Sequence, residues 1–402
     1  MGYVYATINK DTLAHICKEK GVSSEFLASK TKLNMSRLNQ WLTPTDINLP
    51  TINQAKKIAA CLHIPFAGLY MNPCDIPLKR IPNIRNMRTM SGAVSIDDSS
   101  LNIAMIDVLL ERDFLLSADD EFGITPPDFE PLIPDSDSVD EWANAIRKQF
   151  AIDLGEQYKC SSTRQFYLYV RDKIETKGVF VHCFTDVTID TARGFSIYNA
   201  LLPIIGINDE DRPPAKTFTI IHELVHLFKR ESSLCNDMSS SASTLSEEVF
   251  CNAVAGELLV PKRALRIVLE HGHYFAPYSI DDIKRVADRF SVSREVIVRR
   301  LLELRKIDQS EYETYADLFR REIEEDREKR KIQRENGIKS SIPRNMSREA
   351  IDRTSPSVSK ILYQGYGVPH RMGGHGHGAA DRNEGAGGHA QYGHKVSWPV
   401  RL

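Results

Sequence analysis

The apolar positions in residues 1–72 follow a helical period throughout, with no stretch that alternates in the two-residue period of a strand. They predict five short helices, over Lys10–Lys20, Ser24–Ser29, Asn34–Trp41, Thr51–Leu62 and Phe66–Tyr70. Prolines at 73, 77 and 82 then interrupt regular structure, so a linker is expected before the next element.

Residues 100–305 contain both helical and strand patterns. Apolar spacing predicts helices over Ile103–Leu116, Ser138–Phe150 and Gln165–Glu175. Short runs rich in β-branched and aromatic side chains predict three strands of a small sheet, Gly178–Cys183, Gly194–Tyr198 and Leu202–Ile207. Two more helices are expected over Phe218–Arg230 and Glu247–Val260, the second beginning at a capping box and ending before Pro261.

The C-terminal part of the chain has three segments that differ in sequence pattern and composition. Residues 278–304 form a helix, turn and helix pattern that resembles a DNA reader, but its apolar spacing favours packing against the preceding residues. Glu311–Asn336 is expected to be a highly charged, solvated helix. From Gly365 glycine and histidine are interleaved and cannot build a core, so we assign no function to this tail.

Together these patterns predict an α+β protein. An all-α domain at 1–72 is joined through a linker at 73–99 to a mostly helical domain with a small β-sheet at 100–305. A charged helix at 306–340 and a largely disordered tail at 341–402 complete the chain.

Composition excludes some classes of protein and singles out the N-terminal helices. No apolar run approaches membrane-spanning length and no secretion signal is recognisable, so a cytoplasmic protein without a membrane partner is expected. The seven cysteines include no CxxC pair and are interpreted as reduced thiols. Residues 1–72 carry eight Lys or Arg and four Asp or Glu, a positive balance in a chain of net charge −2 that favours contact with phosphate groups.

The helix over Phe218–Arg230 carries the clearest candidate chemistry. His222 and His226 are four residues apart and project from one face, where both can bind one metal ion, with Glu223 beside them. This is the HExxH arrangement of zinc peptidases. The alternative is two core histidines satisfied by hydrogen bonds. Their apolar neighbours predict that the helix is buried, and burying polar side chains costs free energy unless hydrogen bonds or a metal ion offset it.

A catalytic zinc ion needs a third protein ligand. The helix over Glu247–Val260 offers Glu248, with Asn252 one turn further along the same face as an outer-shell partner. Spacing alone does not separate Glu248 from Glu247, and Glu257, half a revolution away, is interpreted as a solvated charge. Cys235 is a further ligand candidate near the site, although a packing thiol is the favoured interpretation.

The two helices together resemble the ImmA/IrrE family of zinc metallo-endopeptidases. The resemblance rests on HELVH followed by E-x-x-C-N-A-x-A-x-E-L-L-V-P from Glu248 to Pro261, on R-G-F at Arg193, and on the strand before the first helix. It implies a gluzincin-like site with Zn²⁺ on His222, His226 and Glu248, and Glu223 as general base. It also implies that the strand over 202–207 is the edge strand of a zincin, which can pair with an extended substrate. Cys251 and Val254 depart from the family pattern in packing positions only.

The N-terminal helices resemble the XRE-type helix-turn-helix of many repressors, since Leu27-Ala28 precede a turn and a helix anchored by Trp41. This resemblance implies binding of double-stranded DNA through residues 1–72. Base contacts are expected from Met35, Ser36, Arg37, Asn39 and Gln40, and backbone contacts from Lys30 and Lys32. Leu42 departs from the family pattern, and a protein-interaction module of five helices is the alternative.

Three functions are compatible with these observations. The family resemblances imply a zinc-dependent endopeptidase coupled to a DNA-binding module, which cleaves a protein substrate such as a transcriptional repressor in a stress or mobile-element circuit. The alternatives are a DNA-binding regulator whose peptidase-like domain senses a ligand, and a toxin–antitoxin component that works by binding a partner. An intact HExxH with Glu248 favours the first.

Overall fold

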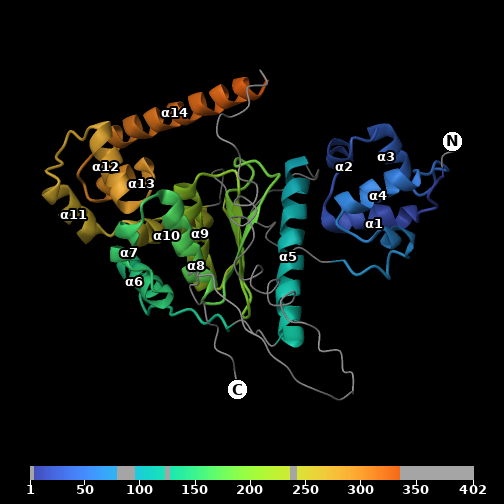
Figure 1. The fold of residues 1–402 in the computed structure, drawn as a ribbon, viewed down its shortest axis with the longest axis horizontal. Helices are drawn as coiled ribbons and strands as arrows, with labels where there is room; N and C mark the ends of the chain where they lie inside the picture. The colour runs from blue at the N-terminus through green and yellow to red at the C-terminus, as the bar shows by residue number, and fades with distance from the viewer. Residues whose placement is uncertain (1–3, 79–95, 123–126, 236–241, 336–402) are drawn as a thin grey trace, which may run out of the picture.

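The computed structural model describes residues 4–78, 96–122, 127–235 and 242–335, so the predicted tail and most of the linker lie outside the described residues. The fold is α+β, as expected, with many helices around one small four-stranded sheet in the described residues. Figure 1 shows the N-terminal helices on one side of a long helix and the sheet with its remaining helices on the other.

The five predicted N-terminal helices are confirmed. They are α1 (Lys10–Lys20), α2 (Ser24–Thr31), α3 (Met35–Leu42), α4 (Ile52–Cys61) and the 3-10 helix η1 (Phe66–Tyr70). Each α-helix begins where a side chain can cap it, and Asn9, Ser23, Asn34 and Thr51 all accept a hydrogen bond from a first-turn N–H. Leu13, Leu27, Leu38, Trp41 and Ile58 fill the core between these helices.

The long helix α5 (Ile96–Phe122) extends well beyond the predicted 103–116 and is apolar on two opposite faces. Ile103 and Ile106 pack into the core of the N-terminal helices. Leu101, Met105 and Val108 pack against the sheet instead. Because α5 is buried on both sides, its apolar positions show no single stripe from which its ends could be predicted.

Three helices lie between α5 and the first strand of the sheet. The predicted pair at 138–150 and 165–175 is confirmed as α6 (Val139–Phe150) and α8 (Thr163–Glu175). Between them lies α7 (Leu154–Lys159), which was not predicted because a six-residue helix shows too little of the helical period.

The sheet consists of β1 (Phe180–Phe184), β2 (Gly194–Ile197), β3 (Ile204–Asn208) and β4 (Ser233–Cys235), in the order β1-β3-β2-β4. The prediction that the strand before the histidine helix is an edge strand was wrong. β3 pairs with β1 in parallel and with β2 antiparallel, so it is internal. The edge beside β2 is β4, which has only three residues and therefore left no strand pattern in the sequence.

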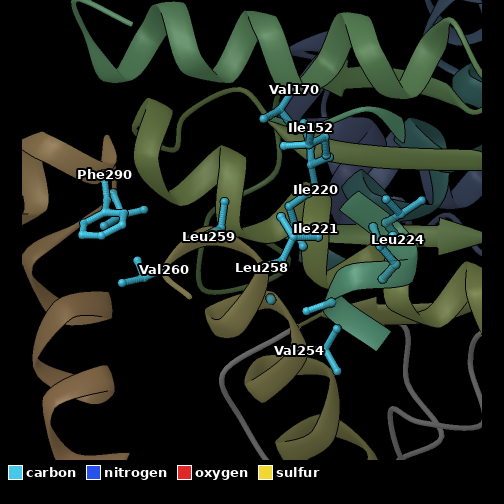
Figure 2. Close-up of a cluster of buried hydrophobic side chains, with 14 of the residues drawn as sticks. Ile152, Val170, Ile220, Ile221, Leu224, Val254, Leu258, Leu259, Val260 and Phe290 are labelled. Atoms are coloured by element: carbon cyan, nitrogen blue, oxygen red, sulfur yellow. The ribbon is translucent and has the colours of Figure 1, made fainter. Parts of the chain in front are cut away.

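Two helices, α9 (Pro213–Phe228) and α10 (Ala242–Leu259), carry the candidate site and pack on each other. The expected capping box is not the start of α10, because the helix begins at Ala242, before Thr244. Figure 2 shows Ile220, Ile221 and Leu224 of α9 in one buried cluster with Val254, Leu258 and Leu259 of α10.

The C-terminal helices are α11 (Lys262–His271), α12 (Ile280–Phe290), α13 (Arg294–Glu303) and α14 (Gln309–Glu335). Val286 and Phe290 of α12 and Leu301 of α13 belong to the same core as α9 and α10. The prediction that residues 278–304 pack against the preceding domain is therefore confirmed.

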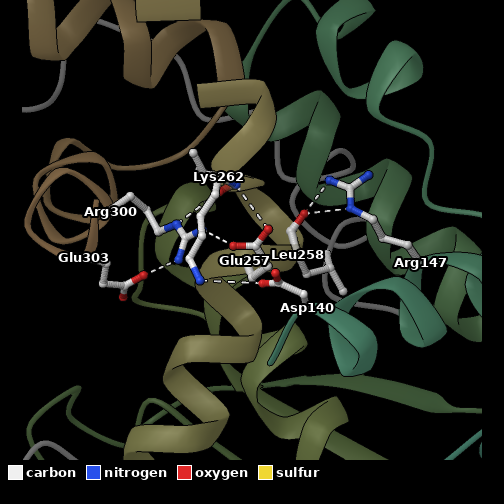
Figure 3. Close-up of polar contacts among 8 residues, drawn as sticks. Asp140, Arg147, Glu257, Leu258, Lys262, Arg300 and Glu303 are labelled. Atoms are coloured by element: carbon white, nitrogen blue, oxygen red, sulfur yellow. Dashed lines mark hydrogen bonds and ion pairs between the residues drawn. The ribbon is translucent and has the colours of Figure 1, made fainter. Parts of the chain in front are cut away.

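The interpretation of Glu257 as a solvated charge was wrong. Glu257 is 8% exposed. Its carboxylate pairs with the buried guanidinium of Arg300 and accepts a hydrogen bond from the Lys262 backbone N–H. Figure 3 shows Arg300 held between Glu257 and Glu303. Arg300 of α13 reaches the face of α10 opposite Glu248, a contact that helical position alone does not reveal.

Candidate metal centre

The buried helix α9 sets the positions of His222, Glu223 and His226. Pro213 and Pro214 occupy its first turn, where the missing N–H groups cost nothing, and residues 219–228, most of them apolar, are all buried. His222 is 1% exposed, Glu223 0% and His226 3%, so the cost of burying them must be offset by specific partners.

The structure brings Glu248 of α10 to the two imidazoles. Its Oε2 lies 3.1 Å from Nε2 of His222, and its Oε1 lies 3.4 Å from Nε2 of His226. The two Nε2 atoms are 3.3 Å apart. These three residues form a group whose potential ligand atoms all lie within 4.8 Å of one another.

This arrangement fits a tetrahedral metal ion. Bonds of about 2.0–2.1 Å to tetrahedrally placed nitrogen and oxygen ligands put those ligands roughly 3.3 Å apart. The Nε2–Nε2 separation of 3.3 Å is close to that spacing, and each Nε2 atom has one Glu248 oxygen at a similar distance, Oε2 at 3.1 Å from His222 and Oε1 at 3.4 Å from His226. Two imidazoles and one carboxylate also form a donor set that zinc accepts while keeping a position for water.

The electrostatics of the group favour a cation between these side chains. Burial lowers the pKa of His226, but hydrogen bonds with Cys251, Glu231 and Glu248 raise it more strongly, to about 12. Burial raises the pKa of Glu248, but its hydrogen bonds to His222 and His226 outweigh burial and hold that pKa well below its usual value. The surroundings that retain a proton on His226 would also attract a divalent ion.

The outer partners orient the two rings. Asn252 Oδ1 lies 3.1 Å from Nδ1 of His222, which leaves Nε2 of that ring directed at Glu248. Nδ1 of His226 faces Sγ of Cys251 and Oε2 of Glu231, each at 3.9 Å. Asn252 thus lies where the sequence placed it, whereas Glu231 and Cys251 were not considered as partners.

Glu223 has a partner that sequence reasoning missed. Ser233 of β4 donates a hydrogen bond to Glu223 Oε2, and Ser196 of β2 lies 3.0 Å from the Ser233 hydroxyl. Oε1 of Glu223 is buried without a hydrogen-bond partner in the described part of the chain. Gly194 allows this approach, because a Cβ there would lie 2.5 Å from Thr219 Cγ2 on α9. No short-range signal could have identified Ser233, since β4 meets α9 only in the folded chain.

Two polar side chains on or next to the sheet have partners outside the candidate site. Arg193 pairs with Asp211 at 3.1 Å, and His182 Nδ1 lies 2.8 Å from Glu111 Oε2. The side chain of Cys235 lies outside the described ones, so its interpretation as a packing thiol stays a prediction.

The predicted DNA-contacting residues lie on α3 and at the end of α2. Met35, Ser36, Arg37 and Asn39 are exposed on the outer face of α3, whereas Gln40 is half-buried. Lys30 is paired with Asp186, in the loop after β1, at 3.1 Å, and Lys32 follows α2 as its left-handed C-cap residue. Contact with DNA remains a prediction for all of them.

No described helix is both long and apolar enough to cross a membrane. Among solved structures, a Mycobacterium tuberculosis transcriptional regulator is similar at 17% identity with a TM-score of 0.28, over 41% of this chain and 46% of the regulator. No curated protein matches the chain. Residues 175–302, which contain the whole candidate site, match the Peptidase_M78 family, described as the IrrE N-terminal-like domain.

Proposed function

We propose that this chain is a zinc-dependent endopeptidase coupled to a DNA-binding module, and that it cleaves a transcriptional repressor. The observation that carries the proposal is the convergence of His222 Nε2, His226 Nε2 and the Glu248 carboxylate, whose ligand atoms all lie within 4.8 Å of one another, with Glu223 on the adjacent position of α9. The match of residues 175–302 to a peptidase family supports the same chemistry.

In this proposal each polar residue of the site has a separate task. His222, His226 and Glu248 would hold the ion, and Asn252 would fix the ring of His222. Zinc bound there would supply Lewis-acid chemistry, polarising a peptide carbonyl and making water acidic enough to react near neutral pH.

Glu223 would act as the general base. Its Oε2 is held by the Ser233 hydroxyl, which leaves the unpartnered Oε1 to take a proton from the attacking water and to pass it to the leaving amine. Ser233 is then a positioning residue, because it touches Glu223 and fixes the direction of its second oxygen.

The substrate would bind as an extended chain. β4 pairs with β2 on one side only in the described residues, so its other edge offers backbone N–H and C=O groups beside α9. An extended peptide could add to this edge, which provides affinity for many sequences. The sequence assigned substrate pairing to β3, but β3 is internal, so we assign it to β4.

The N-terminal helices would bring the peptidase to DNA or to a repressor bound there. The positive balance of residues 1–72 and the exposed polar face of α3 support contact with phosphates and base edges.

A second candidate is a regulator or toxin–antitoxin component whose peptidase-like domain binds a ligand or partner without cleaving it. The burial of the site favours it, because His222, Glu223 and His226 are each at most 3% exposed and the Glu248 side chain is 21% exposed.

The deciding experiment compares the wild type with Glu223→Gln. Both proteins are incubated with proteins encoded by neighbouring genes, new fragments are identified by mass spectrometry, and bound zinc is measured by elemental analysis. We expect zinc in both proteins and fragments only with the wild type, since the amide cannot accept the proton. Equal cleavage by both would reject Glu223 as the base. Zinc binding and tight operator binding without fragments would favour the second candidate.

A further inference from the structure

A cavity of about 560 Å³ lies where the N-terminal helices meet the sheet. Its walls come from α2 and α4 on one side and from α5, β1 and the residues after β1 on the other. None of the residues that line it belongs to the candidate metal centre. Its volume is within the range of about 300–1,000 Å³ that is typical of sites for small molecules.

The lining combines apolar walls with a group of lysines. Phe26, Ile103 and Phe184 are apolar lining residues that are each at most 7% exposed, and Lys30, Lys32 and Lys57 contribute positive charge. Lys30 pairs with Asp186, and His63 pairs with Asp107, which uses both carboxylates of the lining. Lys32 and Lys57 have no ion pair with any residue that the structure describes.

Both lysines are exposed, and an anion placed between them beside the apolar wall could form charge-assisted hydrogen bonds with their ammonium groups. A free phosphate would leave the apolar walls unused, and a neutral apolar molecule would leave the lysines without a partner.

We propose that this cavity binds a small amphipathic anion, with an acidic head group at Lys32 and Lys57 and an apolar body against Phe26, Ile103 and Phe184. The bound molecule would contact the N-terminal helices and the sheet at once. It would also offer Lys30 an alternative to Asp186. The cavity would then be a regulatory site between the two halves of the chain, whether or not the metal centre cleaves a peptide.

Octyl phosphate is a suitable probe, with octanol as the matched molecule without charge and inorganic phosphate as the matched head group without a chain. Binding is measured by calorimetry on the full chain. Its location is read from Cys61, which is half-buried and lines the cavity, by the rate of alkylation at each cysteine. Cys74 is exposed, does not line the cavity, and serves as the internal control.

We expect octyl phosphate to bind with one-to-one stoichiometry and to slow alkylation of Cys61 but not of Cys74. The double variant Lys32→Gln/Lys57→Gln should bind about tenfold or more weakly, because the charged partners of the head group are lost. Lys56→Gln is the matched control, since Lys56 is the neighbour of Lys57 on α4 but lies over the Phe66 ring. Unchanged alkylation of Cys61 at saturation, equal protection by octanol, or equal weakening by Lys56→Gln would overturn the proposal.

Discussion

At the scale of single residues, the candidate site depends on which of two adjacent acids faces the histidines. Spacing left Glu247 and Glu248 equivalent, whereas the structure places the Glu248 oxygens 3.1 Å and 3.4 Å from the two Nε2 atoms. One residue along a helix rotates a side chain by about 100°, so both acids cannot reach the same point.

We therefore predict that Glu248→Gln weakens zinc binding at least a hundredfold, which exceeds the roughly 10–100-fold loss expected when an outer partner such as Asn252 is removed. Glu247→Gln is the matched control and should bind zinc like the wild type. Affinity is measured by competition with a chromophoric chelator. Similar losses in both glutamine variants would contradict the assignment of Glu248.

Zinc binding should also depend on pH in a defined direction. Burial lowers the pKa of His226, but hydrogen bonds with Cys251, Glu231 and Glu248 raise it more strongly, to about 12, so the metal-free site carries a proton that the ion must displace. Binding should release that proton, and the affinity should rise as pH rises. Calorimetry in two buffers of different ionisation enthalpy measures the proton release. A zinc affinity that falls with rising pH would contradict the prediction that zinc displaces a proton from the site.

At the scale of elements, α10 serves two purposes on opposite faces. One face presents Glu248 and Asn252 to α9, and the other presents Glu257 to Arg300 of α13. Arg300 is 1% exposed, so its buried positive charge is compensated by the carboxylates of Glu257 and Glu303 and by the Val260 carbonyl instead of by water. The ion pair thus holds α13 against the helix that supplies the third candidate ligand.

Glu257→Gln should destabilise the protein by roughly 3 kcal/mol, the lower end of the range for breaking a buried ion pair, because Glu303 still faces Arg300. Glu303→Gln is the comparison, and it should cost at most about 1 kcal/mol, since the Glu303 side chain is 31% exposed. Urea denaturation measures both free energies of unfolding. A larger loss for Glu303→Gln would show that Glu257 does not carry this contact.

At the scale of the whole molecule, α5 joins the N-terminal helices to the sheet. Ile106 is fully buried in the N-terminal core, and Val108, two residues further, is fully buried against the sheet. Asn102 of the same helix donates to the Gly21 carbonyl at 2.8 Å, which adds a polar contact to the junction.

Because both cores include α5, Ile106→Ala should lower the unfolding free energy of both halves by about 2–5 kcal/mol. Leu110→Ala, on the same helix but 43% exposed, should have a much smaller effect. Hydrogen exchange of α1–α4 and of the sheet, followed separately in denaturant, reports on each half. A loss of stability confined to α1–α4 would contradict the prediction that Ile106→Ala destabilises both halves.

The sequence by itself determined what depends on neighbours along the chain. The N-terminal helices were predicted to within two residues, because capping side chains and apolar spacing act over one or two turns. The placement of His222, Glu223 and His226 on one buried helix follows from the same local geometry.

Only the tertiary structure decided the contacts between distant segments. These include the internal position of β3, the edge position of β4, the hydrogen bond from Ser233 to Glu223, the burial of Glu257, and the cavity between α2, α4, α5 and β1. Each depends on which faces of separate elements pack together. Helical and strand periods fix the direction of a side chain from its own axis, but not the element that it meets.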